Sequence, residues 1–544
     1  MPGVPVLPVT TPSSVAAPNG AGRASGSDGG GAKTVVDCVI HARWVLPVAP
    51  TPDVVLDHHA VVIHQDTIVA VLPSVDATAR YEAVTVVHRP DHAVLPGFIN
   101  AHIHTGITLM RGCADDTTLF AWLQDTVWPV EGAFTSSPGF CADGARLAMA
   151  EMLASGVTTF ADMYWFPSEA AAAVEAVGMR AVLGIICIGF PSTYATSPNE
   201  YLAKGEAVAA EFSHVDTIHW AYAPHAPYTV DDETWADIGR RSAASGRPVH
   251  THVHETQEEV EASVAGDRTS PSCHQSDTAA RPLANLARLG LLNRRLVAVH
   301  MVHSSTEDIA SVAAAGASIV HCPNSNLKLA AGLAPVAEMV AAGINVALGT
   351  DSAASNNSLN VLAEAKLGAL LAKGVSGDAT AVPAATALAM ATINGARAFG
   401  LEAITGSLEV GKKADVTVMK IANVVGCEPV FSPLSAVIYA ACRKDVSDVW
   451  VNGRRLVADG VVTALDVPAV VAKAEGWRAR IDKCLQRVRA KQVQEAAEKE
   501  GVTAEGAAEG AAEGAAEGAA EGAAEGAAEG AAEGAAEGAA EGAA

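Results

Sequence analysis

The stretch Leu95-Pro96-Gly97-Phe98-Ile99-Asn100-Ala101-His102-Ile103-His104 reads as an apolar strand that ends in two histidines. Alternate residues of a strand point to the same side, so the imidazoles of His102 and His104 can face one interior together. A lone His-x-His pair is a weak signal, but the apolar run and the Pro-Gly turn before it strengthen it. The stretch therefore predicts a buried strand whose end binds a divalent metal.

Similar apolar runs follow for about 300 residues and alternate with Ala-rich helical stretches. The runs cover residues 157–161, 180–189, 217–223, 248–252, 296–300, 318–321 and 345–349. Strand and helix alternation of this length is typical of a parallel α/β barrel. We therefore expect a (β/α)8 TIM-like barrel over residues 97–400.

The two flanks of this region have a different texture, with short β-rich runs separated by turns. Residues 35–96 and 401–467 together predict a small β-sandwich built from both chain ends, and residues 468–500 predict a C-terminal helix. Residues 1–34 are rich in Pro, Gly, Ser and Ala and are expected to be disordered. Residues 501–544 repeat Glu-Gly-Ala-Ala, a low-complexity tail in which frequent glycine disfavours a stable helix.

Composition narrows the class of partner. The formal charge is −24, part of it from the C-terminal repeat, and the chain has no basic stripe of the kind that binds nucleic acid. Nine cysteines at wide spacing, without a Cys-x-x-Cys pair, suit reduced thiols in the cytoplasm. No apolar run reaches the ~18 residues of a membrane span, and the start of the chain lacks a secretory signal. We expect a cytoplasmic protein with a small-molecule substrate and no membrane or nucleic-acid partner, either a monomer or a homo-oligomer.

Further metal-competent residues lie at the ends of later runs. In His250-Thr251-His252-Val253-His254-Glu255-Thr256 the three histidines share parity, so spacing alone does not say which one binds metal. His300 ends another run, and Asp351 follows the last one, where it could instead cap a helix.

Three imidazoles and one carboxylate match a mononuclear site for zinc, with Fe²⁺ as the alternative. Such a metal lowers the pKa of bound water towards ~7. The run before Tyr222-Ala223-Pro224-His225 has no lysine that could bridge a second metal, so one ion is expected. Glu255 stands beside the predicted ligands, where a proton shuttle is needed.

Longer motifs extend these observations along the chain. They are Pro96–His104, Leu109-Met110-Arg111-Gly112-Cys113-Ala114-Asp115-Asp116, Trp122-Leu123, Trp128-Pro129-Val130-Glu131, Ala223-Pro224-His225-Ala226-Pro227-Tyr228, His252-Val253-His254-Glu255-Thr256, His321-Cys322-Pro323-Asn324-Ser325-Asn326-Leu327-Lys328-Leu329 and Gly349-Thr350-Asp351. With them the chain resembles the amidohydrolase superfamily from about residue 35 to about residue 460. Within it, the chain is similar to the S-adenosylhomocysteine/5′-methylthioadenosine deaminases and the related chlorohydrolase group.

The resemblance implies a role for each candidate. The metal ligands would be His102, His104, His252 and Asp351, with the His-x-x-Glu-Thr motif selecting His252. Glu255 would carry a proton to the purine ring nitrogen, His300 would orient the hydroxide, and Asp351 would also take the proton of the water. Substrate contacts would come from His225, from Trp122 by stacking, and from Glu131, whose carboxylate can accept two hydrogen bonds from a ribose cis-diol.

These roles predict a metal-dependent deaminase of an adenine nucleoside with a 5′ thioether, which releases ammonia. The alternatives are guanine or triazine deamination, chloride displacement, and a barrel that acts only as a scaffold. Glu255 favours amine loss, because ammonia needs a proton to leave and chloride does not, and Glu131 favours a riboside.

Two features stay open. Arg180 could reach an amino-acid carboxylate or form a structural salt bridge. The extra stretch 267–280 could cover the site or lie on the surface.

Overall fold

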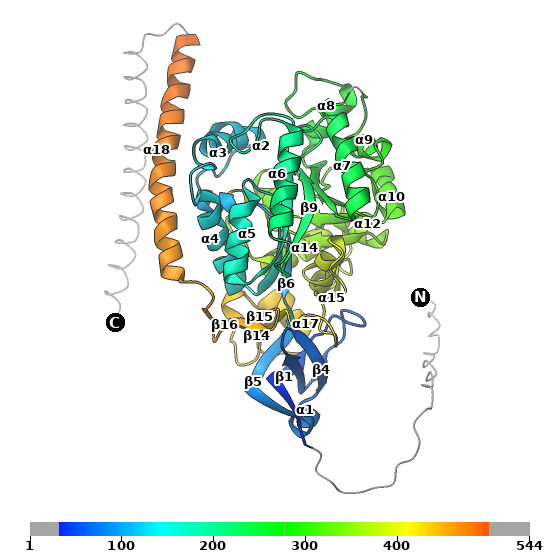
Figure 1. Ribbon diagram of the computed structural model, residues 1–544. Coiled ribbons are helices and arrows are strands. Elements are labelled where there is room, and N and C mark those ends of the chain that lie inside the picture. The colour runs from blue at the N-terminus through cyan, green and yellow to red at the C-terminus, as the bar shows by residue number, and fades with distance from the viewer. Residues whose placement is uncertain (1–31, 277, 500–544) are drawn as a thin grey trace, which may run out of the picture.

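The computed structural model describes residues 32–276 and 278–499. Almost all of the predicted disordered segment 1–34, and the whole repeat 501–544, lie outside the described residues. The described chain forms two sheets, one surrounded by helices and one below it (Figure 1). The first sheet carries the candidate site.

Eight parallel strands form the first sheet in the order in which they follow one another along the chain. They are β6 (Phe98–Ile103), β7 (Val157–Asp162), β8 (Arg180–Cys187), β9 (Ile218–Pro224), β10 (Val249–Val253), β11 (Leu296–His300), β12 (Ser318–His321) and β13 (Asn345–Leu348). Each apolar run expected to be a strand coincides with one of them. The prediction of a parallel barrel is confirmed.

The barrel comes close to closing where the segment after β13 meets β6. The Asp351 amide donates to the His102 carbonyl (3.0 Å), and the Thr350 amide donates to the Asn100 side-chain oxygen (3.0 Å). This approach needs a glycine, because a Cβ on Gly349 would lie 2.8 Å from Cβ of His102. The contact brings two distant motifs of the sequence to one place.

Helices surround the barrel strands (Figure 1). They are α4 (Phe140–Ala154), α5 (Pro167–Val177), α6 (Pro198–Glu211), α7 (Asp232–Ser245), α8 (Gln257–Ala265), α9 (Pro282–Arg288), α10 (Thr306–Ala315), α11 (Pro323–Lys328), α12 (Val336–Ala341), α13 (Ala353–Asn356), α14 (Val361–Ser376), α15 (Ala384–Met390) and α16 (Ile393–Ala398). Several begin at a side-chain cap; for example, Ser305 and Asp308 form a reciprocal capping box at α10. Strand ends and helix starts are thereby fixed at the same edge of the barrel.

The second sheet combines strands from both ends of the chain, as expected. Its strands are β1 (Thr34–Val45), β2 (Leu56–Asp57), β3 (His59–His64), β4 (Thr67–Pro73), β5 (Tyr81–Pro96), β14 (Val416–Lys420), β15 (Val446–Val451), β16 (Arg454–Ala458) and β17 (Val461–Val462). The two ends meet where β5 pairs antiparallel with β14. A separate apolar core holds this unit together, with Ile40, Ile63, Val418 and Trp450 among its buried members. Short helices connect its strands: α1 (Ser74–Arg80), α17 (Pro433–Ser435), η3 (Ala436–Ala440) and η4 (Arg443–Asp445).

A buried ion pair ties this sheet to the barrel. Arg180, the first residue of β8, places its Nε 2.7 Å from Oδ2 of Asp415, and both side chains are almost fully buried. The same guanidinium also donates to the Asn452 side chain. Of the two readings of Arg180, the structural salt bridge is therefore the correct one.

A helical segment and the C-terminal helix complete the barrel on one side. The segment follows β6 and contains η1 (Thr105–Met110), α2 (Leu119–Trp122), η2 (Leu123–Val127) and α3 (Trp128–Phe134). The long helix α18 (Val467–Lys499), predicted from the sequence, lies along this side (Figure 1). Its Trp477, Ile481 and Leu485 are buried in one cluster with residues of the helical segment. We call residues 119–134 the helical wall.

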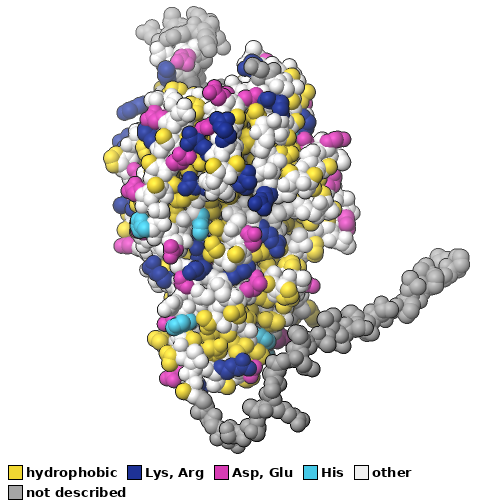
Figure 2. Space-filling view, turned by 45° about the vertical axis from the view of Figure 1, so that its right-hand side comes forward, with side chains coloured by type: hydrophobic (Ala, Val, Ile, Leu, Met, Phe, Trp, Pro, Cys, Tyr) yellow, Lys and Arg dark blue, Asp and Glu magenta, His cyan; other side chains and the backbone are white. Residues whose placement is uncertain are grey.

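The surface has no dominant charge on the face shown in Figure 2, where acidic and basic side chains are interspersed. None of the helices among the described residues is both long and apolar enough to cross a membrane. All nine cysteines lie in the described part of the chain, and all are free thiols.

Candidate metal centre and substrate cavity

Four predicted ligands meet at the carboxyl ends of the barrel strands. One side-chain atom from each of His102, His104, His252 and Asp351 lies within 4.8 Å of the others. Oδ1 of Asp351 is 3.4 Å from Nε2 of His102 and 3.2 Å from Nε2 of His104, and Nε2 of His252 is 3.2 Å from Nε2 of His102. The ligands come from β6, from β10 and from the turn after β13.

Hydrogen bonds on the far side of the rings orient the imidazoles. Nδ1 of His104 donates to the Met163 carbonyl (2.5 Å), and Nδ1 of His252 donates to the His225 carbonyl (2.7 Å). Because a carbonyl can only accept, these bonds fix the proton on Nδ1 and leave the Nε2 lone pairs free. Both free nitrogens are on the side of Asp351 and His102. A set of three imidazole nitrogens and one carboxylate oxygen in this state fits a borderline divalent metal.

Asp351 is held in an uncommon backbone conformation, with φ of 57°. Its Oδ2 accepts hydrogen bonds from Ser325 Oγ (2.6 Å) and Ser355 Oγ (3.1 Å), so Oδ1 is the oxygen left to face the histidines. Burial acts to raise the pKa of Asp351, but hydrogen bonds with His102 and His104 outweigh it and hold the pKa well below its usual range. The carboxylate is therefore ionised and available as a ligand.

Glu255 and His300 stand beside this centre. With Asp351 they form a second group of closely spaced ligand atoms, and Oε1 of Glu255 is 3.7 Å from Nε2 of His300. Burial raises the pKa of the Glu255 carboxyl, which favours its protonated form. His300 has a φ of 73°, and its Nδ1 lies 2.8 Å from the Asn326 side-chain oxygen. Within the described chain its Nε2 has no hydrogen-bond partner, so this nitrogen is available to a bound molecule.

The two neighbouring histidines of β10 lie elsewhere. Nε2 of His250 is 2.9 Å from Nδ1 of His102, so His250 supports that ring from behind. Nε2 of His254 accepts a hydrogen bond from the Leu283 amide (3.1 Å). Of the three histidines that spacing left equivalent, His252 is the one that the fold places with His102, His104 and Asp351.

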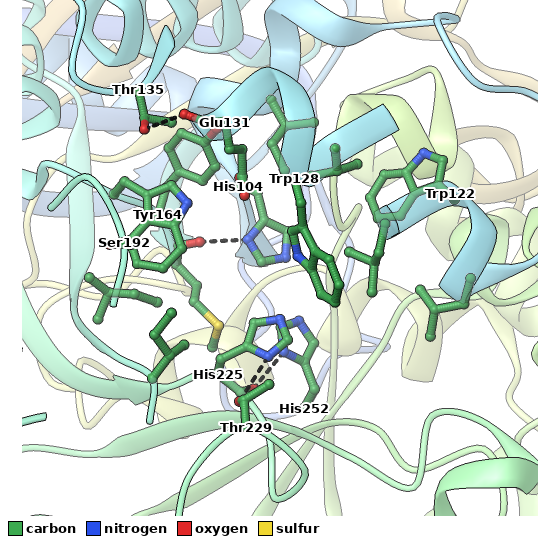
Figure 3. Close-up of a pocket in the computed structure, with 18 of the residues that line it drawn as sticks. His104, Trp122, Trp128, Glu131, Thr135, Tyr164, Ser192, His225, Thr229 and His252 are labelled. Atoms are coloured by element: carbon green, nitrogen blue, oxygen red, sulfur yellow. Dashed lines mark hydrogen bonds between the residues drawn. The ribbon is translucent and has the colours of Figure 1, made fainter. Parts of the chain in front are cut away.

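A cavity of about 240 Å³ begins at this centre and leads outward. Its inner end, which we call the metal end, contains His104, His225, His252, Glu255, His300 and Asp351. Its sides are formed by the helical wall and by residues that follow β7, β8 and β9. Figure 3 shows the metal end with Trp128 and Trp122 on one side and Glu131 and Tyr164 on the other.

The predicted substrate contacts all line this cavity, and their packing differs. Trp122 is 6% exposed and belongs to the apolar cluster behind the wall, whereas Trp128 is 40% exposed and stands nearer to His104 in Figure 3. Burial raises the pKa of Glu131 to about 7, against the lowering effect of the neighbouring Trp165 and Tyr164 side chains. Trp128 therefore offers a more open ring face than Trp122.

His225 has two contacts. Its carbonyl orients His252, and its Nδ1 lies 3.2 Å from Thr229 Oγ1. Burial lowers the pKa of His225 to about 3, and nearby histidines add to the effect. His225 is consequently a neutral imidazole at the boundary between the metal end and the rest of the cavity.

Several residues of the site were not predicted from the sequence. The sequence alone assigns no role of their own to Ser325 and Asn326, yet they hold Asp351 and His300. Their place in the motif that follows β12, at a strand end, is the signal that could have identified them. The Met163 carbonyl carries no such signal, because a backbone group leaves no trace in residue type.

The stretch 267–280, apart from residue 277, contributes nothing to the cavity and instead packs near the start of α7, where the Gln275 amide donates to the Pro227 carbonyl (3.0 Å).

Comparison with known proteins places the chain in a family and identifies similar relatives. The model of the amidohydrolase family matches residues 93–456. A protein from Teredinibacter turnerae named 5-methylthioadenosine/S-adenosylhomocysteine deaminase is 42% identical over 448 residues, which are 82% of this chain and 98% of that protein. A protein of the same name from Saccharophagus degradans is 39% identical, with the same coverage of both chains.

Solved structures agree with the fold. The crystal structure of an adenosine deaminase from Xanthomonas campestris with bound zinc is 43% identical, with a TM-score of 0.79, and the match covers 83% of this chain and 100% of that one. An atrazine chlorohydrolase from Arthrobacter aurescens, complexed with zinc, is 23% identical with a TM-score of 0.72, over 81% and 100% of the two chains. At that identity the likeness concerns the fold alone.

Proposed function

The chain belongs to the amidohydrolase family, and from this premise we propose that it is a zinc-dependent hydrolytic deaminase of adenine nucleosides. Relatives that cover most of the chain are named 5-methylthioadenosine/S-adenosylhomocysteine deaminase. The observation that carries the proposal is the position of Glu255, a buried carboxyl beside both His300 and the predicted ligands. A site built only to bind metal does not need this additional acid.

The donor set at the metal end fits one divalent ion. His102, His104, His252 and Asp351 would hold it, and their Nε2 and Oδ1 atoms face one another. Zinc supports hydrolysis at neutral pH by making water acidic enough to supply hydroxide. We propose zinc over Fe²⁺ because the solved adenosine deaminase, 43% identical, contains it.

The residues beside the ligands would control the protons of the reaction. The new C–O bond forms at the ring carbon that carries the amine, and the C–N bond to that amine then breaks. Glu255, whose pKa is raised by burial, can hold a proton at the ring nitrogen and pass it on to the departing ammonia. His300, with Nδ1 beside Asn326, would direct its Nε2 at the oxygen that adds to the ring. Asp351 would accept the proton of the attacking water.

The cavity wall supports a nucleoside over a free base. Glu131 lies next to the metal end, and a carboxylate at this position can accept both hydroxyls of a ribose cis-diol. Trp122 and Trp128 offer ring surface to a planar base, and His225 offers a neutral ring nitrogen. A triazine has neither the diol nor the ribose that this arrangement would hold.

We also propose that the enzyme works in the cytoplasm. Its nine cysteines are free thiols, and eight of them are buried or partly buried. Reduced thiols of this kind are usual in a reducing compartment.

The proposal is tested by measuring ammonia release from a panel of compounds together with the metal content of the purified protein. The panel contains adenosine, 5′-methylthioadenosine, S-adenosylhomocysteine, guanine and a melamine-type triazine. We expect turnover on the adenine nucleosides and about one zinc per chain. Activity confined to guanine or the triazine would contradict the nucleoside assignment, and activity without any bound metal would contradict the metal site.

A further inference from the structure

The outer part of the cavity decides which 5′ substituent the nucleoside can carry. The amine of adenine and the ribose lie at opposite edges of the base, and the 5′ carbon lies farther along the ribose. If the amine is at the metal end and the diol is at Glu131, the 5′ substituent points to the outer part of the cavity. That part includes Ile188, Phe190, Ser192 and Thr193 from the segment that follows β8.

No lysine or arginine is found among the described residues that line the cavity. The acidic side chains that line it are Glu131, Glu255 and Asp351. Two basic side chains on β8 and α6 are engaged elsewhere. Arg180 is paired with Asp415 at the opposite end of β8, and Lys204 on α6 binds Glu200 (2.7 Å) and the Tyr194 carbonyl (2.7 Å).

We propose that the site selects adenine nucleosides whose 5′ substituent is uncharged, such as a short alkylthio group, and disfavours an amino-acid thioether. This inference rests on the proposed function and concerns the substrate of the same site. A carboxylate that enters a cavity without a cationic partner loses hydration and gains no ion pair in return. An alkyl chain does not meet this penalty and can pack on Ile188 and Phe190.

The experiment separates charge from length by using three thioethers of adenosine. They are 5′-methylthioadenosine, 5′-butylthioadenosine and S-adenosylhomocysteine, of which the last two carry 5′ chains of similar length. We expect kcat/KM to be similar, within about tenfold, for the two alkyl compounds and about 100-fold lower for S-adenosylhomocysteine, as loss of a charge partner implies. Equal values for the butylthio compound and S-adenosylhomocysteine would overturn the inference, whether both are high or both are low.

Failure of the proposed function gives a different result. In that case none of the three thioethers releases ammonia, while the protein still binds metal, and the inference falls together with the function it rests on. Deamination of S-adenosylhomocysteine at the rate of the methylthio compound overturns the inference alone and leaves the deaminase assignment in place.

A matched pair of variants tests whether the missing cation causes the discrimination against S-adenosylhomocysteine. Thr193 lies at the cavity edge, is exposed, and bonds through its hydroxyl to Thr135 Oγ1 (2.7 Å). In Thr193→Arg the ratio of kcat/KM for S-adenosylhomocysteine to that for the butylthio compound should rise about tenfold, because the carboxylate gains a partner. Thr193→Gln, similar in reach but neutral, should leave the ratio within about twofold. An equal rise in both variants would show that charge is not the cause and would overturn the inference.

Discussion

The metal end and the helical wall of the cavity are built in different ways. The metal end stands on strand ends of the barrel. Its His252 and Asp351, together with the predicted ligand His102, are buried and fixed by hydrogen bonds on their far sides. The helical wall, residues 119–134, has few polar anchors and is held mainly by apolar packing against α18. Trp128 within it is 40% exposed. The residues expected to act in catalysis are thus held by hydrogen bonds at the metal end. The residues expected to select the substrate are held by apolar packing in the helical wall.

Substitutions in the two regions should therefore have different effects. At the metal end each group has a direct chemical task, so a change without any loss of volume can abolish turnover. At the wall a change acts through position and should alter binding more than the chemical step.

The largest effect is expected for Glu255→Gln. The amide keeps the shape of the side chain but cannot transfer a proton, so kcat should fall by about 10²- to 10⁴-fold. Metal content should stay unchanged, because Glu255 is not one of the four predicted ligands. Stopped assays of ammonia release together with metal analysis measure both quantities.

The matched control is Glu261→Gln on α8, the helix that begins two residues after Glu255, where the carboxylate is exposed and bonds only to Gln257 among the contacts described. Its kcat should stay within twofold of the parent. A Glu255→Gln protein that retains more than a tenth of the parent kcat, or that loses its metal, would remove Glu255 from the proton-transfer role.

The division between the two regions also explains what could be predicted from the sequence. The metal end could be predicted because its ligands sit at strand ends, where an apolar run changes to His, Glu or Asp within one or two residues. Even there, the equal parity of His250, His252 and His254 does not distinguish the ligand, and only the resemblance to a family indicates His252. Only the fold itself shows that His250 lies behind His102.

The wall is less predictable because its contacts are long-range. Nothing in the run around Trp122 and Trp128 distinguishes the ring that packs into the cluster from the ring that stands in the cavity. That distinction depends on α18, more than 300 residues later in the chain, which covers one face of the segment. The sequence predicts a helix over residues 468–500 but does not predict which surface that helix covers.

The second prediction concerns Glu131, which joins the two regions. Glu131→Ala should lower kcat/KM for adenosine-type ribosides by about 100-fold, the value of two hydrogen bonds to a charged acceptor. For free adenine, which has no diol, the change should be less than about threefold. The comparison is made with both compounds on the same enzyme preparation.

Asp125→Ala serves as the control, because Asp125 lies on the outer side of the wall and binds Gln492 of α18 (2.7 Å). Asp125→Ala removes one carboxylate from the wall and leaves Glu131 in place. The ratio of kcat/KM for the riboside to kcat/KM for the free base should therefore not change. Equal losses on riboside and free base in Glu131→Ala would contradict its role at the ribose.

The smallest effect is expected from α18 itself. Leu485 is buried against the wall, and its neighbour Cys484 places Sγ 4.0 Å from the Pro129 carbonyl. Leu485→Ala leaves a gap behind α3, which should loosen the wall and weaken substrate binding by about 1 kcal/mol, roughly fivefold in KM. Because no described residue of α18 is among those that line the cavity, kcat and metal content should stay within twofold of the parent. Val471→Ala, exposed on the same helix, should change neither KM nor the melting temperature. If Leu485→Ala lowers kcat as strongly as it raises KM, the wall and the metal end are coupled, and the division between positioning and chemistry does not hold.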